Sequence, residues 1–62
     1  MKLDQFIKWQ GIASTGGEAK HLVQSGKVIV NGTLETRRGR ELIQGDLVCI
    51  GSHELFVDES VH

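Results

Sequence analysis

Apolar residues recur at helical spacing in two stretches within the first half of the chain. In the first stretch, Leu3, Phe6 and Ile7 share one face of a helix that we expect to end at Trp9 or Gln10. The glycine that follows is expected to end this helix. So short a helix is not stable alone, and it must pack against a neighbour to bury its apolar face.

The second stretch is predicted to be a helix because both of its ends are marked. Thr15 can cap the N-terminus, and Glu18 stands three residues later, so the two side chains can close a capping box. The apolar positions at i, i+3 and i+4 form one stripe for a core, at Ala19, Leu22 and Val23. A C-terminal end is predicted at Gly26, because glycine takes the left-handed conformation without a Cβ clash.

The pattern then changes from helical spacing to β-branched residues around a turn. Residues 27–30 and 33–36 are predicted to pair as a hairpin. The reason is the pair Asn31-Gly32 between them, which is the strongest short signal for a type I′ turn.

Further apolar runs follow a polar loop at residues 37–40. Leu42 and Ile43 are expected to return to the core, and strands are predicted at residues 47–50 and 55–57. Turns are expected before each of these strands. The predicted fold class is α+β, with two short N-terminal helices packed on a small, mostly antiparallel sheet.

The length of 62 residues allows one domain at most, with a small core. We therefore expect one domain over 1–62, with its core at about 2–50 and a C-terminal strand and acidic tail at 51–62.

No apolar run approaches the roughly 20 residues needed to span a bilayer, and no signal-peptide pattern is present. Cys49 is the only cysteine, and three scattered histidines give no metal-ligand spacing. We expect a cytoplasmic protein with no metal, no cofactor and no membrane contact.

Charge is distributed unevenly along the chain. All seven Lys and Arg lie within residues 1–50 beside five acids, a net of +2, whereas residues 51–62 carry three acids and no Lys or Arg. A basic body is compatible with an RNA partner. The acidic tail could fold over the basic face as an RNA mimic, a hypothesis that its charge alone motivates.

Three arginines stand within four residues, and they are the first candidate binding group. Guanidinium groups are planar donor forks that suit phosphate, and Gly39 lets the backbone turn tightly between them. The alternative is a solvated loop in which the arginines pair with Glu35 and Glu41. The residues concerned are Arg37, Arg38 and Arg40.

Several motifs in a fixed order carry a resemblance to a known family. They are Lys-Leu-Asp-x-Phe-Ile-Lys, Gly-Ile-Ala, Glu-Ala-Lys, Gly-Lys-Val-x-Val-Asn-Gly and Gly-Asp-Leu-Val, which run from about Lys2 to Ile50. In this order and spacing the chain resembles the S-four RNA-binding domain, named after ribosomal small-subunit protein four. The stretch from Glu35 to Arg40 resembles the corresponding stretch in the small stand-alone bacterial members of this family. The resemblance implies the alpha-L RNA-binding motif fold and binding to structured RNA, such as ribosomal RNA.

The start of the second helix is a second candidate site. Gly16 and Gly17 leave backbone N–H groups bare, and such a helix end can hold a phosphate oxygen. The alternative is that Thr15 and Glu18 already satisfy these donors. The chain departs from the family here, since most members carry a Ser-Arg pair where this one has Thr15-Gly16.

Scattered lysines complete the predicted RNA-binding surface. The resemblance places Lys2, Lys20 and Lys27 on the RNA-facing side. Lys20 lies outside the apolar stripe of its helix and should be exposed. One exposed lysine is usually only a solubilising charge, but a cluster with three arginines forms a surface that positions phosphates.

Three other residues that could bind or react are predicted to have structural roles instead. His21 is expected to be a half-buried helix residue rather than a base-stacking or proton-carrying group, and Trp9 and Cys49 are expected in the core. No catalytic constellation is recognisable, so we expect no enzyme. The predicted function is a monomeric, non-catalytic RNA-binding module. The alternative is an adaptor whose arginine-rich loop binds an acidic partner, such as a ribosomal protein.

Overall fold

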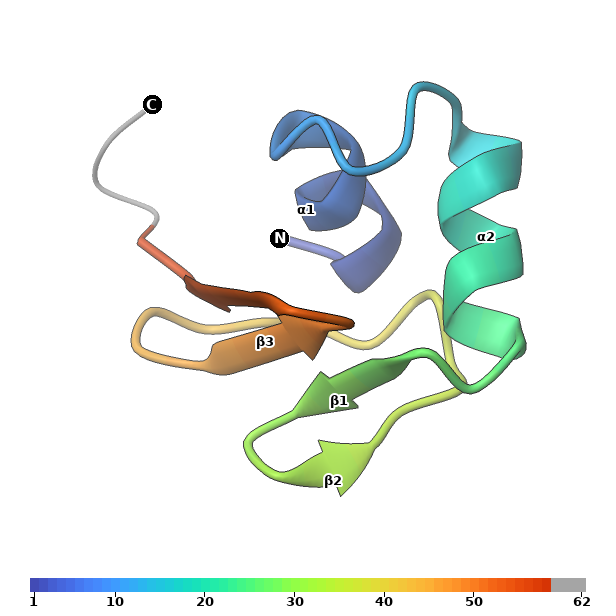
Figure 1. Ribbon diagram of the computed structural model, residues 1–62. Coiled ribbons are helices and arrows are strands. Elements are labelled where there is room, and N and C mark those ends of the chain that lie inside the picture. Colours follow the sequence, from blue (N-terminus) through green and yellow to red (C-terminus); the bar gives the residue numbers. More distant parts are fainter. Residues whose placement is uncertain (59–62) are drawn as a thin grey trace.

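Both predicted helices form and lie on the same face of a small sheet in the computed structural model, which describes residues 1–58 (Figure 1). The elements run α1 (Leu3–Trp9), α2 (Gly16–Gln24), β1 (Val28–Val30), β2 (Thr33–Leu34), β3 (Leu47–Ile50) and β4 (His53–Phe56). The predicted α+β class is confirmed. None of the helices in residues 1–58 is long and apolar enough to cross a bilayer.

The sheet is antiparallel throughout, with the strand order β2-β1-β3-β4. The turn between β1 and β2 has positive φ at both central residues, 51° at Asn31 and 80° at Gly32, as a type I′ turn requires. The predicted hairpin is therefore confirmed, although both strands are shorter than expected. β4 begins at His53, earlier than predicted, because Ile50 and His53 already pair across the tight turn that joins it to β3.

The core lies between the helices and the inner face of the sheet. Side chains alternate between the two faces of a strand, so every second residue of β1 and β3 points toward the helices. The buried residues of these elements are Leu3, Phe6, Ile7, Ala19, Val23, Val28, Val30, Val48 and Ile50. Val57 is also buried, just after β4, and it exchanges backbone hydrogen bonds with the turn at Gly45 and Asp46.

Two large apolar residues lie outside the core, contrary to expectation. Trp9 is 59% exposed, because it lies outside the face of α1 that carries the buried residues Leu3, Phe6 and Ile7. Ile43 is 65% exposed, whereas Leu42 before it is buried. The Ile43 N–H donates to the Asp46 carboxylate at 3.0 Å, which fixes the turn with the Ile43 side chain directed outward.

Cys49 and His21 also differ from expectation. Cys49 is half-buried rather than in the core, because it pairs with Ile29 and Glu54 and shares their outer face of the sheet. His21 is exposed rather than half-buried, since the core side of α2 is taken by Ala19 and Val23. Of the three acids in the predicted tail, Glu54 and Asp58 are described and Glu59 lies outside the described residues, and the RNA mimic stays a hypothesis.

Candidate nucleic-acid interface

The arginine-bearing segment, residues 35–40 (the arginine loop), is anchored to the N-terminus of α1 by backbone hydrogen bonds. The Leu3 N–H donates to the Arg40 carbonyl at 2.9 Å, and the Asp4 N–H donates to the Arg38 carbonyl at 3.1 Å. The first N–H groups of a helix have no partner within the helix, and the side chain of the N-cap residue, Lys2, does not bind them here. The arginine loop therefore serves as the cap of α1, which gives it a fixed position.

Two basic residues lie beside this anchored loop. Lys2 forms an isolated antiparallel bridge with Glu41, directly after the loop. At the start of the loop, the Glu35 N–H donates to the Val28 carbonyl at 3.0 Å, next to Lys27. In Figure 1 the loop, coloured yellow, passes between the start of α1 and the C-terminal end of α2. The fold thus brings both lysines to the arginines.

Glu35 organises two of the three arginines. Its side chain is buried, and its carboxylate accepts the Arg37 backbone N–H at 3.1 Å and the Arg37 Nε at 3.1 Å. It also accepts Arg37 Nη2 at 3.3 Å and Arg40 Nη1 at 3.1 Å. The hydrogen bonds from Arg37, first of all, lower the pKa of Glu35 to about 2. The same contact raises the pKa of Arg37.

The three arginines therefore differ in what they offer to a ligand. The Arg37 side chain is 78% exposed although it binds Glu35, whereas that of Arg40 is only 28% exposed. Arg38 is exposed, and within residues 1–58 no carboxylate pairs with it. The alternative interpretation, in which the arginines pair with acids of the loop, is correct at Glu35 for two of the three arginines. Pairing with Glu41 is wrong, because that carboxylate binds the amino terminus of the chain instead.

The predicted residues on α2 lie further from the arginine loop. Lys20 is exposed, as expected. Thr15, Gly16 and Gly17 lie at the opposite end of α2 from Lys27. A helix of this length separates its two ends by about 13 Å. The predicted RNA-binding residues therefore form one group around the arginine loop, and the start of α2 is a second candidate site apart from it.

The capping box at the start of α2 forms only in part. Thr15 Oγ1 accepts the Glu18 N–H at 3.1 Å, as predicted. The Glu18 carboxylate, however, binds the residue before Thr15, accepting the Ser14 N–H at 3.1 Å and the Ser14 hydroxyl at 2.9 Å. These bonds from Ser14 lower the pKa of Glu18. Within residues 1–58, no hydrogen bond occupies the N–H groups of Gly16 and Gly17.

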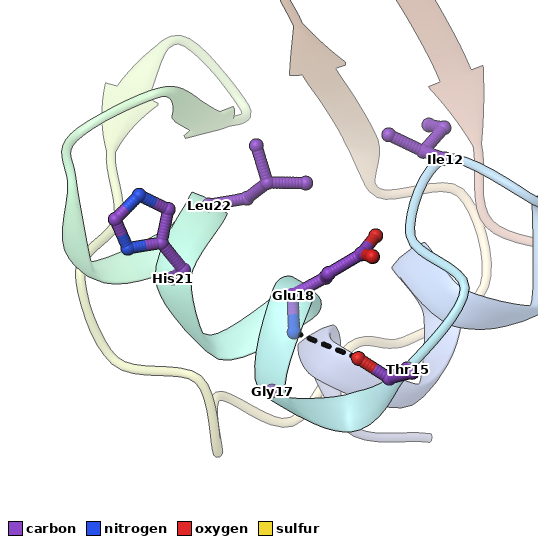
Figure 2. Close-up of a pocket in the computed structure, with 6 residues that line it drawn as sticks. All are labelled: Ile12, Thr15, Gly17, Glu18, His21 and Leu22. Atoms are coloured by element: carbon purple, nitrogen blue, oxygen red, sulfur yellow. Dashed lines mark hydrogen bonds between the residues drawn. The ribbon is translucent and has the colours of Figure 1, made fainter.

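An open groove of about 440 Å³ runs along this half of α2. Figure 2 shows its lining side chains, with Glu18 reaching toward Ile12 and His21 at the far end. The lining residues are Ile12, Thr15, Gly17, Glu18, His21 and Leu22. The groove was not predicted, because it depends on where the connection between the helices passes. Among the described residues, no three His, Cys, Asp or Glu side chains come close enough to hold a metal ion.

Two helices on an antiparallel sheet, with an anchored arginine loop beside two lysines, define a small α+β domain with a group of basic residues around one loop. The sequence comparison assigns the class, since residues 1–58 match the S4 domain. The chain belongs to the S4 RNA-binding domain family, as its motifs indicate.

Two relatives are similar over most of this chain. The Bacillus subtilis (strain 168) "Probable ribosome maturation protein RlbA" is 41% identical over 46 residues, 74% of this chain and 65% of that protein. The Escherichia coli (strain K12) "Putative RNA-binding protein YbcJ" is 30% identical over 57 residues, 92% of this chain and 81% of that protein. The chain thus spans slightly less than two thirds of the Bacillus relative.

Proposed function

We propose that this protein is a single-domain, non-catalytic RNA-binding module that recognises structured RNA, such as ribosomal RNA, in the cytoplasm. It acts as a monomer without metal or cofactor. The observation that supports this most is the anchoring of the arginine loop to the first turn of α1. A basic segment held by backbone hydrogen bonds presents its side chains from a fixed position, which lowers the entropic cost of binding.

Phosphate contacts would come mainly from the arginine loop and its neighbours. Arg38 offers a whole guanidinium fork, and Arg37 offers the part that Glu35 does not use. Lys2, Lys20 and Lys27 add point charges that suit phosphate without fixing its geometry. Readout would be mainly of RNA shape, because the deep major groove of an RNA helix hides the base edges.

The start of α2 would make a separate contact. Thr15, Gly16 and Gly17 carry backbone N–H groups that point out of the helix end, where a phosphate oxygen would be favourable. The Glu18 carboxylate weakens this site, because it binds Ser14 directly before the helix start and would repel a phosphate there. We therefore assign the larger share of the binding to the arginine loop.

The relatives support this proposal through their names. One is named as an RNA-binding protein and the other as a ribosome maturation protein. Taken together, the two names suit a role in RNA binding at or near the ribosome, and we extend this role to the chain as part of the proposal.

A salt titration with a synthetic RNA hairpin tests the proposal. Neutralising three or four phosphates predicts that log K falls with log salt with a slope of about −2 to −4. Arg38→Ala should reduce the magnitude of this slope by about one and weaken binding at low salt. Lys8→Ala is the matched control, since it removes one exposed charge from the last turn of α1 and should change the slope less.

Absence of any binding to the hairpin at low salt would overturn the proposal. The adaptor alternative would then lead, with an acidic protein on the arginine loop. A bidentate carboxylate contact would be lost in Arg38→Lys, whereas a loose phosphate contact would tolerate that change.

A further inference from the structure

We propose that Glu35 is a positioning residue of the RNA interface, which holds Arg37 and Arg40 in the orientation that meets phosphate. This inference rests on the proposed function and deepens it. At first sight an acid in a nucleic-acid interface opposes binding, because it repels phosphate. The geometry around Glu35 points to the opposite effect.

The carboxylate of Glu35 is fully engaged by its two arginines. Oε2 accepts the backbone N–H and the Nε of Arg37, and Oε1 accepts Nη2 of Arg37 and Nη1 of Arg40. A carboxylate has about four acceptor positions, and these four bonds occupy them. The backbone N–H of Glu35 is itself bound to the Val28 carbonyl, so the anchor of this cluster is a strand end.

The contact with Glu35 leaves much of the Arg37 guanidinium available. A guanidinium has five N–H donors, and Glu35 takes the one on Nε and one on Nη2. The donors on Nη1 stay unused by Glu35, and the side chain is 78% exposed. Arg37 is therefore held along one edge while its other edge faces solvent.

Burial explains why the negative charge of Glu35 need not repel RNA. Glu35 is 6% exposed, and the guanidiniums of Arg37 and Arg40 bind both of its oxygens. The cluster of one acid and two arginines keeps a net positive charge. Holding two rotamer-rich arginines before the ligand arrives removes part of the ordering cost of binding.

A competing interpretation is that Glu35 sequesters the arginines as an internal anion that phosphate must displace. The two interpretations predict opposite signs for the same variant. Glu35→Gln removes a negative charge, so on electrostatic grounds alone it should strengthen RNA binding. If Glu35 positions the arginines, the same variant should weaken binding.

The test compares the binding of Glu35→Gln and Glu41→Gln to the same RNA hairpin, at a temperature well below the midpoint of thermal unfolding of each variant. We expect Glu35→Gln to bind about threefold to tenfold more weakly than wild type. Glu41 lies just after the loop and binds the amino terminus rather than an arginine. Its variant adds the same charge change and should bind as tightly as wild type or more tightly.

A double-mutant cycle separates positioning from a general effect on the fold. In the Arg37→Ala background, Glu35→Gln should weaken binding much less than in wild type, because the main group that it positions is absent. If Glu35→Gln does not fold, Arg37→Lys replaces it. That variant keeps the charge and loses the fork that binds Glu35, and it should lose RNA affinity to a similar extent.

Three results would overturn the inference. They are binding of Glu35→Gln that equals or exceeds wild type, a loss of the same size in the Arg37→Ala background, and an unchanged affinity of Arg37→Lys. Failure of the wild type to bind the hairpin would instead reject the proposed function, and this inference with it. The two failures are therefore distinguishable.

Discussion

Asn31 and Asp46 hold two turns of the sheet together through their side chains. Asn31 Nδ2 donates to Asp46 Oδ1 at 3.0 Å, and Asn31 Oδ1 accepts the Leu47 N–H at 2.9 Å. Asp46 is buried, and hydrogen bonds from the Ile43 backbone and then from Asn31 lower its pKa. The residue that favours the hairpin turn therefore also locks the turn that precedes β3.

The dual role of Asn31 predicts that Asn31→Ala destabilises the fold by about 2 to 3 kcal/mol, because two hydrogen bonds are lost and alanine is strained at positive φ. Asn31→Gly also loses both hydrogen bonds, but glycine adopts the positive φ of 51° without strain, so its effect on stability measures the hydrogen bonds alone. It should lose about 1 kcal/mol less. Urea unfolding of the three proteins measures the difference. An equal loss for both variants would show that backbone strain at this turn is negligible.

Glu35 should make the stability of the fold depend on pH in the acid range. Its pKa is lowered from 4.5 to about 2 in the folded state, so its contribution is complete above pH 4.5 and disappears as the pH falls toward 2. Because Arg37 is largely exposed and the pair is partly screened, we expect a contribution of about 1 to 2 kcal/mol. Glu35→Gln should be less stable than wild type at pH 7.

The measurement is the urea midpoint of wild type and Glu35→Gln between pH 7 and pH 2. The two proteins should converge at the acid end, since both then carry a neutral residue at this position. Other acids with lowered pKa values, among them Glu18 and Asp46, contribute equally to both proteins and cancel in the comparison. A difference that stays constant across the range would contradict the role of the Glu35 charge.

Leu42 and Ile43 are neighbours with opposite expected sensitivities. Leu42 is buried, and Leu42→Ala should cost about 2 to 4 kcal/mol through lost burial and a residual cavity. Ile43 is exposed, and Ile43→Ala should change stability by less than about 0.5 kcal/mol. Thermal unfolding of both variants checks the prediction. Similar losses at the two positions would contradict the outward direction of Ile43.

Gly16→Arg should strengthen RNA binding. This change adds a cation where the family resemblance implies an arginine, and nothing within 4 Å would meet a Cβ added at Gly16. One added phosphate contact should increase the magnitude of the salt slope by about one. Gly16→Gln is the control, since it adds a long side chain without charge and should leave the slope unchanged. An unchanged slope for Gly16→Arg would place RNA away from the start of α2.

Local signals were sufficient for the order and type of the elements, although not for the ends of β2 and β4. The helix of α2, the turn at Asn31-Gly32 and the ends of β3 all follow from spacing, capping and glycine conformations that involve only neighbouring residues. The family could also be read from motif order. Residues such as Trp9 and Ile43 were misplaced because an apolar side chain near an element does not reveal which way it points.

The two helices, the hairpin, β3 and an arginine-rich loop between β2 and β3 follow from the order of the amino acids alone. The three-dimensional fold adds that the backbone of this loop caps α1, and that Glu35 rather than Glu41 binds its arginines. These contacts escape prediction because helix and turn preferences act between residues a few positions apart. The partners of α1 and of the amino terminus lie more than thirty positions away in the chain, and folding alone brings them together.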